Sequence, residues 1–329
     1  MEAIPLPQLR GSVSRPLEGL RVLLVASFNR RYHQIGFDLA RALRNLGCAV
    51  ARQEDGQRWI YSLWKVPLER RLERALRRHV PDLVLVYKGE RLDPAGIARL
   101  RPLSRARWAN WFPDDPHLLE LSLGLAPAYD AFFTHDSYSA ALHRERGYPT
   151  HYLPFGVDPV RLQPVAVPER YRSALAFVGT RDAPRAHLLD AVADLGLTVW
   201  GPGWPRGPLY GSDFVRTLGA ADIGLNVHQQ VPPLGDPARY GHGANLRVFE
   251  LAALGTPQLC DAKADIDALF VPGQEIVLYR DITELREQVG RMRGDPAWRA
   301  SLAAAARQRV LDEHTWEHRL RTLLSLTLQ

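Results

Sequence analysis

An arginine and a glutamate lie three residues apart in an otherwise apolar stretch, residues 245–257. This spacing places Arg247 and Glu250 on one face of a predicted helix, near its N-terminus. Backbone N–H groups and a guanidinium suit phosphate there, and a carboxylate can accept hydrogen bonds from ribose hydroxyls. The pair therefore fits a nucleotide site. It also fits an ordinary salt-bridged amphipathic helix, so the segment alone leaves both interpretations open.

Two turns that follow predicted strands also carry residues suited to a nucleotide. Gly179 and Thr180 follow the strand predicted over residues 174–178, and Arg185 lies in the next helix. This arrangement suits a phosphate, or the glycine simply ends the strand. The stiff Gly/Pro loop after residues 197–200 has aromatic surface that either walls a base-binding slot or forms a structural turn. Its candidate residues are Gly201, Gly203, Trp204 and Tyr210.

Two asparagines flank a long Gly/Pro-rich loop, residues 229–243. Asn226 lies in the preceding predicted strand, residues 223–227, and Asn245 opens the helix that carries Arg247. A loop of this length in a compact domain is usually functional or mobile. We therefore include both asparagines among the candidate nucleotide-binding residues.

Polar side chains also follow strands of the first half of the chain. Asp114 and Asp115 follow the strand predicted over residues 107–111. They could bind a metal, but no histidine with metal-ligand spacing accompanies them, and capping of the helix at His117 is the favoured role for at least one. His135 and Asp136 are general-base candidates, with helix capping as the alternative for Asp136.

These residues must be positioned by alternating strands and helices. Short apolar runs alternate with helical patterns in both halves, which predicts an α/β fold of two doubly wound domains with the ligand at the C-terminal strand edges, in the cleft between them. The Pro-rich passage around residues 154–168 is predicted to be an interdomain linker. The predicted strands cover residues 21–26, 48–52, 82–87, 107–111, 131–134, 151–153, 174–178, 197–200, 223–227, 256–260 and 276–279.

Composition limits the classes of function. The 329 residues are 46% hydrophobic and 24% charged, as in soluble globular proteins, and no long apolar window predicts a signal peptide or membrane span, so we expect a cytoplasmic protein. Cys48 and Cys260 are too far apart to predict a disulfide framework or a structural zinc site. The net charge of +6 admits anionic partners. The basic stretch at residues 69–79 fits a solvated helix face better than a nucleic-acid site.

Several segments together resemble the CgeB-like (spore-protein type) glycosyltransferases of the GT-B superfamily. They are residues 129–136, 152–159, 177–180, 247–255 and 314–316, with Arg185 and Arg319. The resemblance implies two Rossmann-like domains facing across a cleft, with C-terminal helices. It implies an acceptor domain over residues 1–157, a linker over 158–171, a nucleotide-sugar donor domain over 172–312, and a last helix over 313–329 that crosses back to the first domain.

The resemblance also implies an activity: transfer of a sugar from a nucleotide-diphosphate sugar to an unknown glycan, protein or small molecule, by a monomer or homodimer without metal or nucleic acid. Glu250 then contacts the donor ribose, and Arg247 and Arg185 lie near the diphosphate. Related retaining enzymes carry a second Glu eight positions earlier, where this chain has His242. A retaining enzyme needs no protein base.

Two alternatives accompany this expectation. An inverting enzyme would need a base, which Asp114, Asp115, His135 or Asp136 would supply. A two-domain protein of the same fold that binds a nucleotide or sugar without transferring it is the alternative function.

Overall fold

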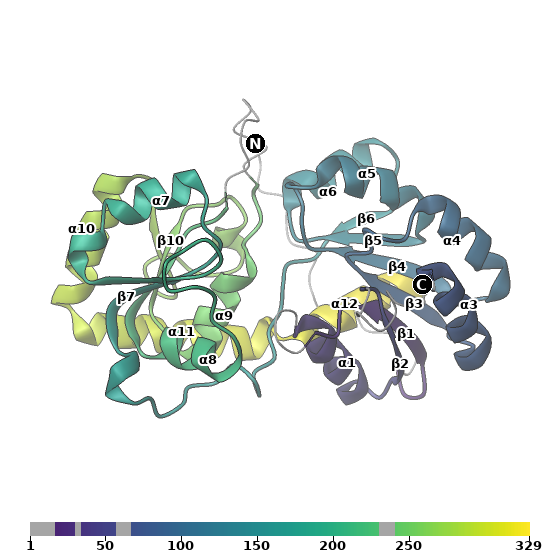
Figure 1. Ribbon diagram of the computed structural model, residues 1–329, viewed down its shortest axis with the longest axis horizontal. Helices are drawn as coiled ribbons and strands as arrows, with labels where there is room; N and C mark the ends of the chain where they lie inside the picture. The colour runs from purple at the N-terminus through teal and green to yellow at the C-terminus, as the bar shows by residue number, and fades with distance from the viewer. Residues whose placement is uncertain (1–16, 30–33, 57–66, 230–240) are drawn as a thin grey trace. The chain divides into compact units, whose positions relative to one another are not determined.

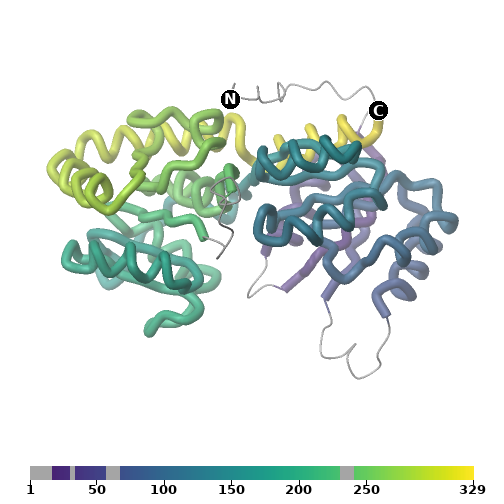
Figure 2. The backbone as a smooth tube through the Cα atoms, turned by 90° about the horizontal axis from the view of Figure 1, so that it is seen from above, coloured from purple at the N-terminus to yellow at the C-terminus, as the bar shows by residue number. Residues whose placement is uncertain are grey.

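The computed structural model describes residues 17–29, 34–56, 67–229 and 241–329. The chain divides into two compact units, which we describe separately (Figure 1). Unit 1 comprises Met1–Pro154 together with Trp316–Gln329, and unit 2 comprises Phe155–Thr315. The last helix of the chain, yellow in Figure 2, thus belongs to the same unit as the first 154 residues.

Unit 1 is built on a parallel six-stranded sheet in the order β2-β1-β3-β4-β5-β6. Its strands are β1 Arg21–Ala26, β2 Ala49–Glu54, β3 Leu83–Tyr87, β4 Arg107–Phe112, β5 Ala131–Thr134 and β6 Thr150–Tyr152. All five residues of β3 are buried, as expected for a central parallel strand covered on both faces.

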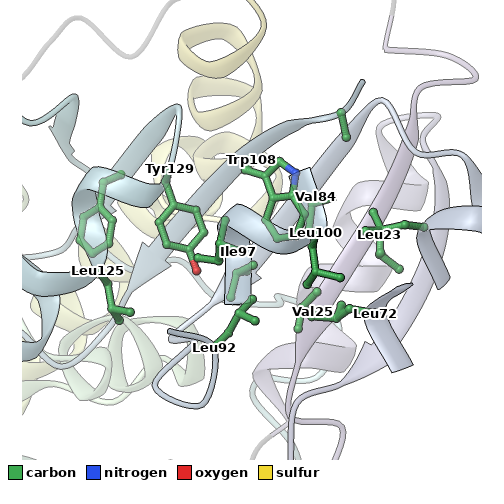
Figure 3. Packing of buried hydrophobic residues seen from close by; sticks show 14 of the residues in the cluster. Leu23, Val25, Leu72, Val84, Leu92, Ile97, Leu100, Trp108, Leu125 and Tyr129 are labelled. Carbon is green, nitrogen blue, oxygen red and sulfur yellow. The ribbon is translucent and has the colours of Figure 1, made fainter. Parts of the chain in front are cut away.

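Helices cover both faces of this sheet. They are α1 Ile35–Asn45, α3 Leu68–His79, α4 Pro94–Leu100, α5 Leu119–Leu125, α6 Ser137–Glu145 and α12 Trp316–Leu328. On one face Trp111 of β4 meets Trp316 of α12 edge to face, 5.4 Å between ring centroids. On the other, Trp108 packs with Leu72 of α3 and Leu100 of α4 in one apolar cluster (Figure 3).

Unit 2 has a parallel five-stranded sheet in the order β11-β10-β9-β7-β8. Its strands are β7 Ser173–Val178, β8 Leu197–Trp200, β9 Ala221–Asn226, β10 Gln258–Asp261 and β11 Val277–Tyr279. Its helices are α7 Ala183–Asp190, α8 Gly211–Gly219, α9 Leu246–Leu254, α10 Ile282–Gly294 and α11 Pro296–Glu313. Both sheets place the first strand of the unit between its second and third, so each has a point where the strand order reverses. In open α/β sheets, ligands bind at this point, beyond the carboxyl ends of the strands.

The predicted α/β fold is confirmed, and each predicted strand is present to within a few residues. The apolar pattern of residues 264–269 predicts a helix, and this prediction is wrong, because these residues form only the short 3-10 turn Ile266–Ala268. Their apolar residues serve burial instead, because Ile266 and Leu269 lie in the core. Most of the long loop at residues 229–243 lies outside the described residues. Within the described part of the chain, no helix is long and apolar enough to cross a membrane.

Candidate functional site

The reversal point of the unit 2 sheet lies between β7 and β9. Gly179 and Thr180 follow β7, and Val227 and His228 follow β9. The N-terminus of α9 lies at the same edge, because the side chains of Asn226 and Asn245 exchange two amide hydrogen bonds of 3.0 Å. The structure therefore gathers most of the predicted donor-site residues at one sheet edge.

Arg247 and Glu250 form an ion pair through Nη1 and Oε2. Arg247 also donates from Nε and Nη2 to the carbonyl of Val178, at 3.3 and 3.2 Å, and its guanidinium stacks over the ring of Phe214 at 4.5 Å. Glu250 is 7% exposed, and among the described residues nothing donates a hydrogen bond to its Oε1. The pair thus ties α9 to the end of β7 and leaves one carboxylate oxygen available to a ligand.

Arg185 is also engaged, but differently. Its Nε and Nη2 donate to the carbonyl of Val227, at 3.1 and 2.8 Å, and Nη1 donates to that of Thr180 at 2.9 Å. It lies 3.6 Å from Asp182, the N-cap of α7, and burial lowers the pKa of Arg185. This buried guanidinium joins the ends of β7 and β9. Its contact with a diphosphate stays a prediction.

The two helix N-termini at this edge differ in charge. The Asp182 carboxylate caps α7 by accepting from the backbone N–H of Arg185 at 2.8 Å. α9 is capped by a neutral amide, because Asn245 Oδ1 accepts from the N–H of Val248 at 3.3 Å. An anion is favoured where the helix N-terminus carries no opposing carboxylate. The charges therefore favour α9 as the phosphate-binding end.

His228, which is not among the predicted site residues, supports the start of α9. His228 Nδ1 lies 2.7 Å from Asp261 Oδ1, and Nε2 accepts the backbone N–H of Asn245 at 3.0 Å. The second bond requires the tautomer with its proton on Nδ1, which donates to the carboxylate. Burial acts to raise the pKa of Asp261, but His228 and the charge of Lys263 together outweigh it, so the pKa is lowered. In the sequence, this pair could have been found only from the position of Asp261 at the end of a strand.

Cys260 lies beside this pair, and the three side chains place possible metal-ligand atoms within 4.8 Å of one another. Hydrogen bonding accounts for their arrangement. Both nitrogens of His228 are engaged, and burial raises the pKa of the Cys260 thiol well above its usual value, so the neutral thiol is favoured. A thiol binds metal as the thiolate.

The Gly/Pro loop after β8 folds back on the end of β7. Trp204 Nε1 donates to the carbonyl of Gly179 at 3.0 Å, and the Arg181 guanidinium stacks over the Trp204 ring at 5.4 Å. Gly203 is exposed, and Tyr210 is the half-buried residue before α8. The loop is thus a hydrogen-bonded turn next to the proposed site, and its role in base binding stays a prediction.

Gly201 makes the closest approach in this loop. Its φ is 140°, and a Cβ at this position would lie 1.9 Å from the carbonyl oxygen of Gly179. We expect Gly201→Ala to lower the free energy of unfolding by about 2 kcal/mol or more, measured by urea denaturation. Gly207→Ala is the control, because Gly207 also has positive φ but no atom within 4 Å of its Cβ position. Equal losses in both variants would contradict the steric explanation.

The candidate residues of unit 1 divide into two sets. Asp114 is partly exposed and pairs through Oδ2 with Lys88 Nζ at 3.0 Å. Asp115 is fully buried and accepts from Ser122 Oγ at 2.6 Å. The expected capping role of this Asp pair is wrong, because the residue before α5 is Leu118 and no side chain caps that helix. Their carboxylates are used in an ion pair and in a buried network instead.

The other two candidates follow β5. Asp136 caps α6 by accepting from the backbone N–H of Ser139 at 2.7 Å, which confirms the capping alternative. His135 is 7% exposed. Deep burial of both side chains gives little access to an acceptor, so neither is favoured as a general base. Asp114 is the most accessible of the four predicted bases.

The buried network of Asp115 makes the stability of the protein depend on pH. Burial raises the pKa of Asp115 to about 7. Between about pH 4 and 7 the folded protein therefore keeps a proton that the unfolded chain releases, and the free energy of unfolding falls as the pH rises. His143, whose Nε2 lies 3.0 Å from Ser122 Oγ, acts oppositely: burial lowers its pKa to about 4, so stability falls as the pH drops from 6.5.

Replacing Asp115 by Asn should remove only the first of these effects. The stability of Asp115→Asn relative to the wild type should rise by roughly 4 kcal/mol between pH 4 and pH 8, from a shift of about three pKa units. Urea unfolding of both proteins at the two pH values measures this difference. A difference that is the same at both pH values would show that Asp115 titrates normally.

Comparisons with known proteins agree with this architecture. Residues 181–325 match a family model described as glycosyl transferase-like. Over 266 residues the chain is 23% identical to the spore protein CgeB of Bacillus subtilis strain 168, covering 72% of this chain and 80% of CgeB. Residues 181–325 therefore form a glycosyl transferase-like region of this chain. It is a distant relative of CgeB, as its motifs predicted.

Solved structures place this chain in the GT-B fold. Sucrose-phosphate synthase from Thermosynechococcus elongatus matches with a TM-score of 0.66 at 15% identity, over 92% of this chain and 96% of that one. Anabaena HepE in complex with UDP-glucose matches with a TM-score of 0.65 at 12% identity, over 94% and 100%. AviGT4, a glycosyltransferase of avilamycin A biosynthesis, matches with a TM-score of 0.62 at 18% identity, over 93% and 97%.

Proposed function

We propose that this glycosyltransferase moves a sugar from a nucleotide-diphosphate sugar to an acceptor hydroxyl, with retention of configuration and without a metal. The observation that carries the proposal is the carboxylate of Glu250. It is buried beside a neutrally capped helix N-terminus at the reversal point of a parallel sheet, and its Oε1 accepts no hydrogen bond from the described residues. Such an oxygen is suited to ribose hydroxyls.

The parts of the chain divide between the two substrates in this proposal. Residues 172–312 bind the donor, and residues 1–157 bind the acceptor, with 158–171 as the linker. HepE, a protein of the same fold, has been crystallised with UDP-glucose, which favours a UDP-sugar as the first donor to test. The acceptor class is a glycan, a protein or a small molecule.

The chemistry follows from the groups at the start of α9. When the bond from the anomeric carbon to the phosphate oxygen breaks, its electron pair stays on the nucleoside diphosphate. Backbone N–H groups of α9 and the guanidinium of Arg247 then stabilise the growing negative charge. Arg185 holds the ends of β7 and β9 in place for this contact. The acceptor oxygen bonds to the anomeric carbon and loses its proton. In a retaining reaction the leaving phosphate can accept that proton.

A panel of nucleotide sugars tests the proposal. We expect release of the nucleoside diphosphate from at least one donor, and a higher rate when an acceptor is added. Thermal stabilisation by a nucleotide sugar without release on any acceptor would instead favour a non-catalytic protein that binds the same ligand. Such a result would suggest that transfer was lost with the glutamate that relatives carry at the position of His242.

A further inference from the structure

Lys88 adopts a backbone conformation that is costly for its residue type. Its φ is 69°, and among the described residues Val80 is the only other non-glycine residue with a positive φ. A side chain in this left-handed region is strained, and glycine would fit there more easily. Residues held in such conformations cluster at functional sites. Lys88 follows β3 immediately, and the reversal point of the unit 1 sheet lies between β1 and β3.

The backbone of Lys88 is fixed by its neighbours. Its N–H donates to the carbonyl of Trp111 at 2.9 Å, and its own carbonyl accepts from Asn110 Nδ2 at 3.1 Å. Asn110 is fully buried in β4. The following residue, Gly89, also has a positive φ of 81°. The chain thus turns sharply at the sheet edge, and the turn determines where the Lys88 side chain lies.

The ammonium of Lys88 bridges two carboxylates. Nζ lies 3.0 Å from Asp114 Oδ2 and 3.1 Å from Glu90 Oε2. Among the described residues nothing donates a hydrogen bond to Asp114 Oδ1 or Glu90 Oε1. The three side chains are each between one third and one half exposed. They therefore present two accessible oxygen acceptors and one donor, with a net charge of −1.

A buried hydroxyl beside this triad also lacks a partner. Tyr87 is 8% exposed, and its OH has no hydrogen-bond partner among the described residues. Burial, together with the nearby charge of Asp114, raises the pKa of Tyr87 well above its usual value, so the OH keeps its proton. An unpaired buried hydroxyl costs free energy unless a ligand or water satisfies it. Tyr87 thus places a proton donor without a hydrogen-bond partner near the charge of Asp114, one of the three triad residues.

We propose that Lys88, Glu90 and Asp114 form the acceptor-binding site of unit 1, and that the acceptor is a neutral, hydroxyl-rich molecule such as a sugar or polyol. The inference rests on the proposed glycosyl transfer and names the acceptor class. Acceptor hydroxyls donate to Asp114 Oδ1 and Glu90 Oε1. The net negative charge disfavours an anionic acceptor. Lys88 acts as a positioning residue, because it holds both carboxylates through the strained turn.

Four variants separate this role from a structural one. Lys88→Met removes the bridge, Lys88→Arg keeps a cation, and Lys88→Gly removes both the side chain and the backbone strain. Arg99→Met is the matched control, because Arg99 also forms an exposed ion pair in the same unit, with Glu69. Initial rates of UDP release are measured with UDP-glucose as donor and with methyl glucoside and glycerol as probe acceptors. Donor binding is measured separately by calorimetry with UDP.

We expect Lys88→Met and Lys88→Gly to raise the acceptor KM by about tenfold or more, the worth of one charge-assisted contact. The Kd for UDP should stay at the wild-type value in both, and Arg99→Met should match the wild type in every readout. Lys88→Gly should also melt at or above the wild-type temperature, because glycine relieves the strain. Lys88→Arg should recover part of the loss.

A lower melting temperature in Lys88→Met and Lys88→Gly with an unchanged acceptor KM would overturn the proposal and leave Lys88 a structural ion pair. Failure of both probe acceptors to raise UDP release in an otherwise active wild type would also overturn it, since it names neutral polyols. Failure of the wild type to release a nucleoside diphosphate from any donor is a different result, and it would overturn the proposed function instead.

Discussion

Glu250→Gln should bind UDP about 10- to 100-fold more weakly than the wild type, the worth of one or two hydrogen bonds to a charged group. Gln keeps the size of the side chain, so α9 should stay packed, and its amide oxygen is a weaker acceptor for ribose hydroxyls than a carboxylate. Calorimetric titration with UDP measures the affinity, and the melting temperature checks the fold.

The matched control is Glu275→Gln. Glu275 lies in the same unit, is 11% exposed at its side chain where Glu250 is 10%, and also pairs with an arginine, Arg309. Its substitution should break a similar ion pair without changing the affinity for UDP. If both variants bind UDP as the wild type does, Glu250 does not contact the ribose.

Arg247→Met should lower kcat by about 10²- to 10³-fold. This corresponds to the loss of one contact to a developing oxyanion, which contributes about 3 to 4 kcal/mol in the transition state. The effect should appear mainly in kcat, because the charge on the leaving diphosphate grows as the sugar bond breaks. Some loss of stability should accompany it, since the Val178 carbonyl loses both donors that the guanidinium supplies.

Arg309→Met is the control for Arg247→Met, because it breaks the equivalent ion pair with Glu275. We expect a similar loss of stability with kcat close to that of the wild type. Steady-state rates of UDP release with a fixed acceptor measure both variants. A kcat for Arg247→Met within about threefold of the control would show that Arg247 ties α9 to β7 without acting on the leaving group.

Sequence patterns predicted the elements of the fold well, because apolar periodicity and strand-end glycines are local signals. The segment 245–254 shows this: its capping residue, its apolar face and the glycine after it are all local features of the sequence, and α9 ends at that glycine, Gly255, in the left-handed conformation. The helix prediction for residues 264–269 was wrong because it also used a local signal. The apolar residues there indicated a helix, but they only fill the core.

The candidate site was predicted in outline but not in its contacts. Its residues come from the ends of different strands, and which groups meet there depends on the strand order, which no local pattern contains. Arg185 illustrates the limit, because no local pattern indicates that the Val227 carbonyl lies within its reach. Lys88 and His228 were missed for a related reason: their roles depend on Asp114 and Asp261, which lie at the ends of other strands.

A crystal structure of the protein with UDP tests the proposed donor site most directly. We predict that the ribose hydroxyls lie within hydrogen-bond distance of Glu250 and that the diphosphate lies against the N-terminus of α9, beside Arg247. A UDP molecule bound at another place in unit 2, with Glu250 still paired only to Arg247, would contradict this prediction.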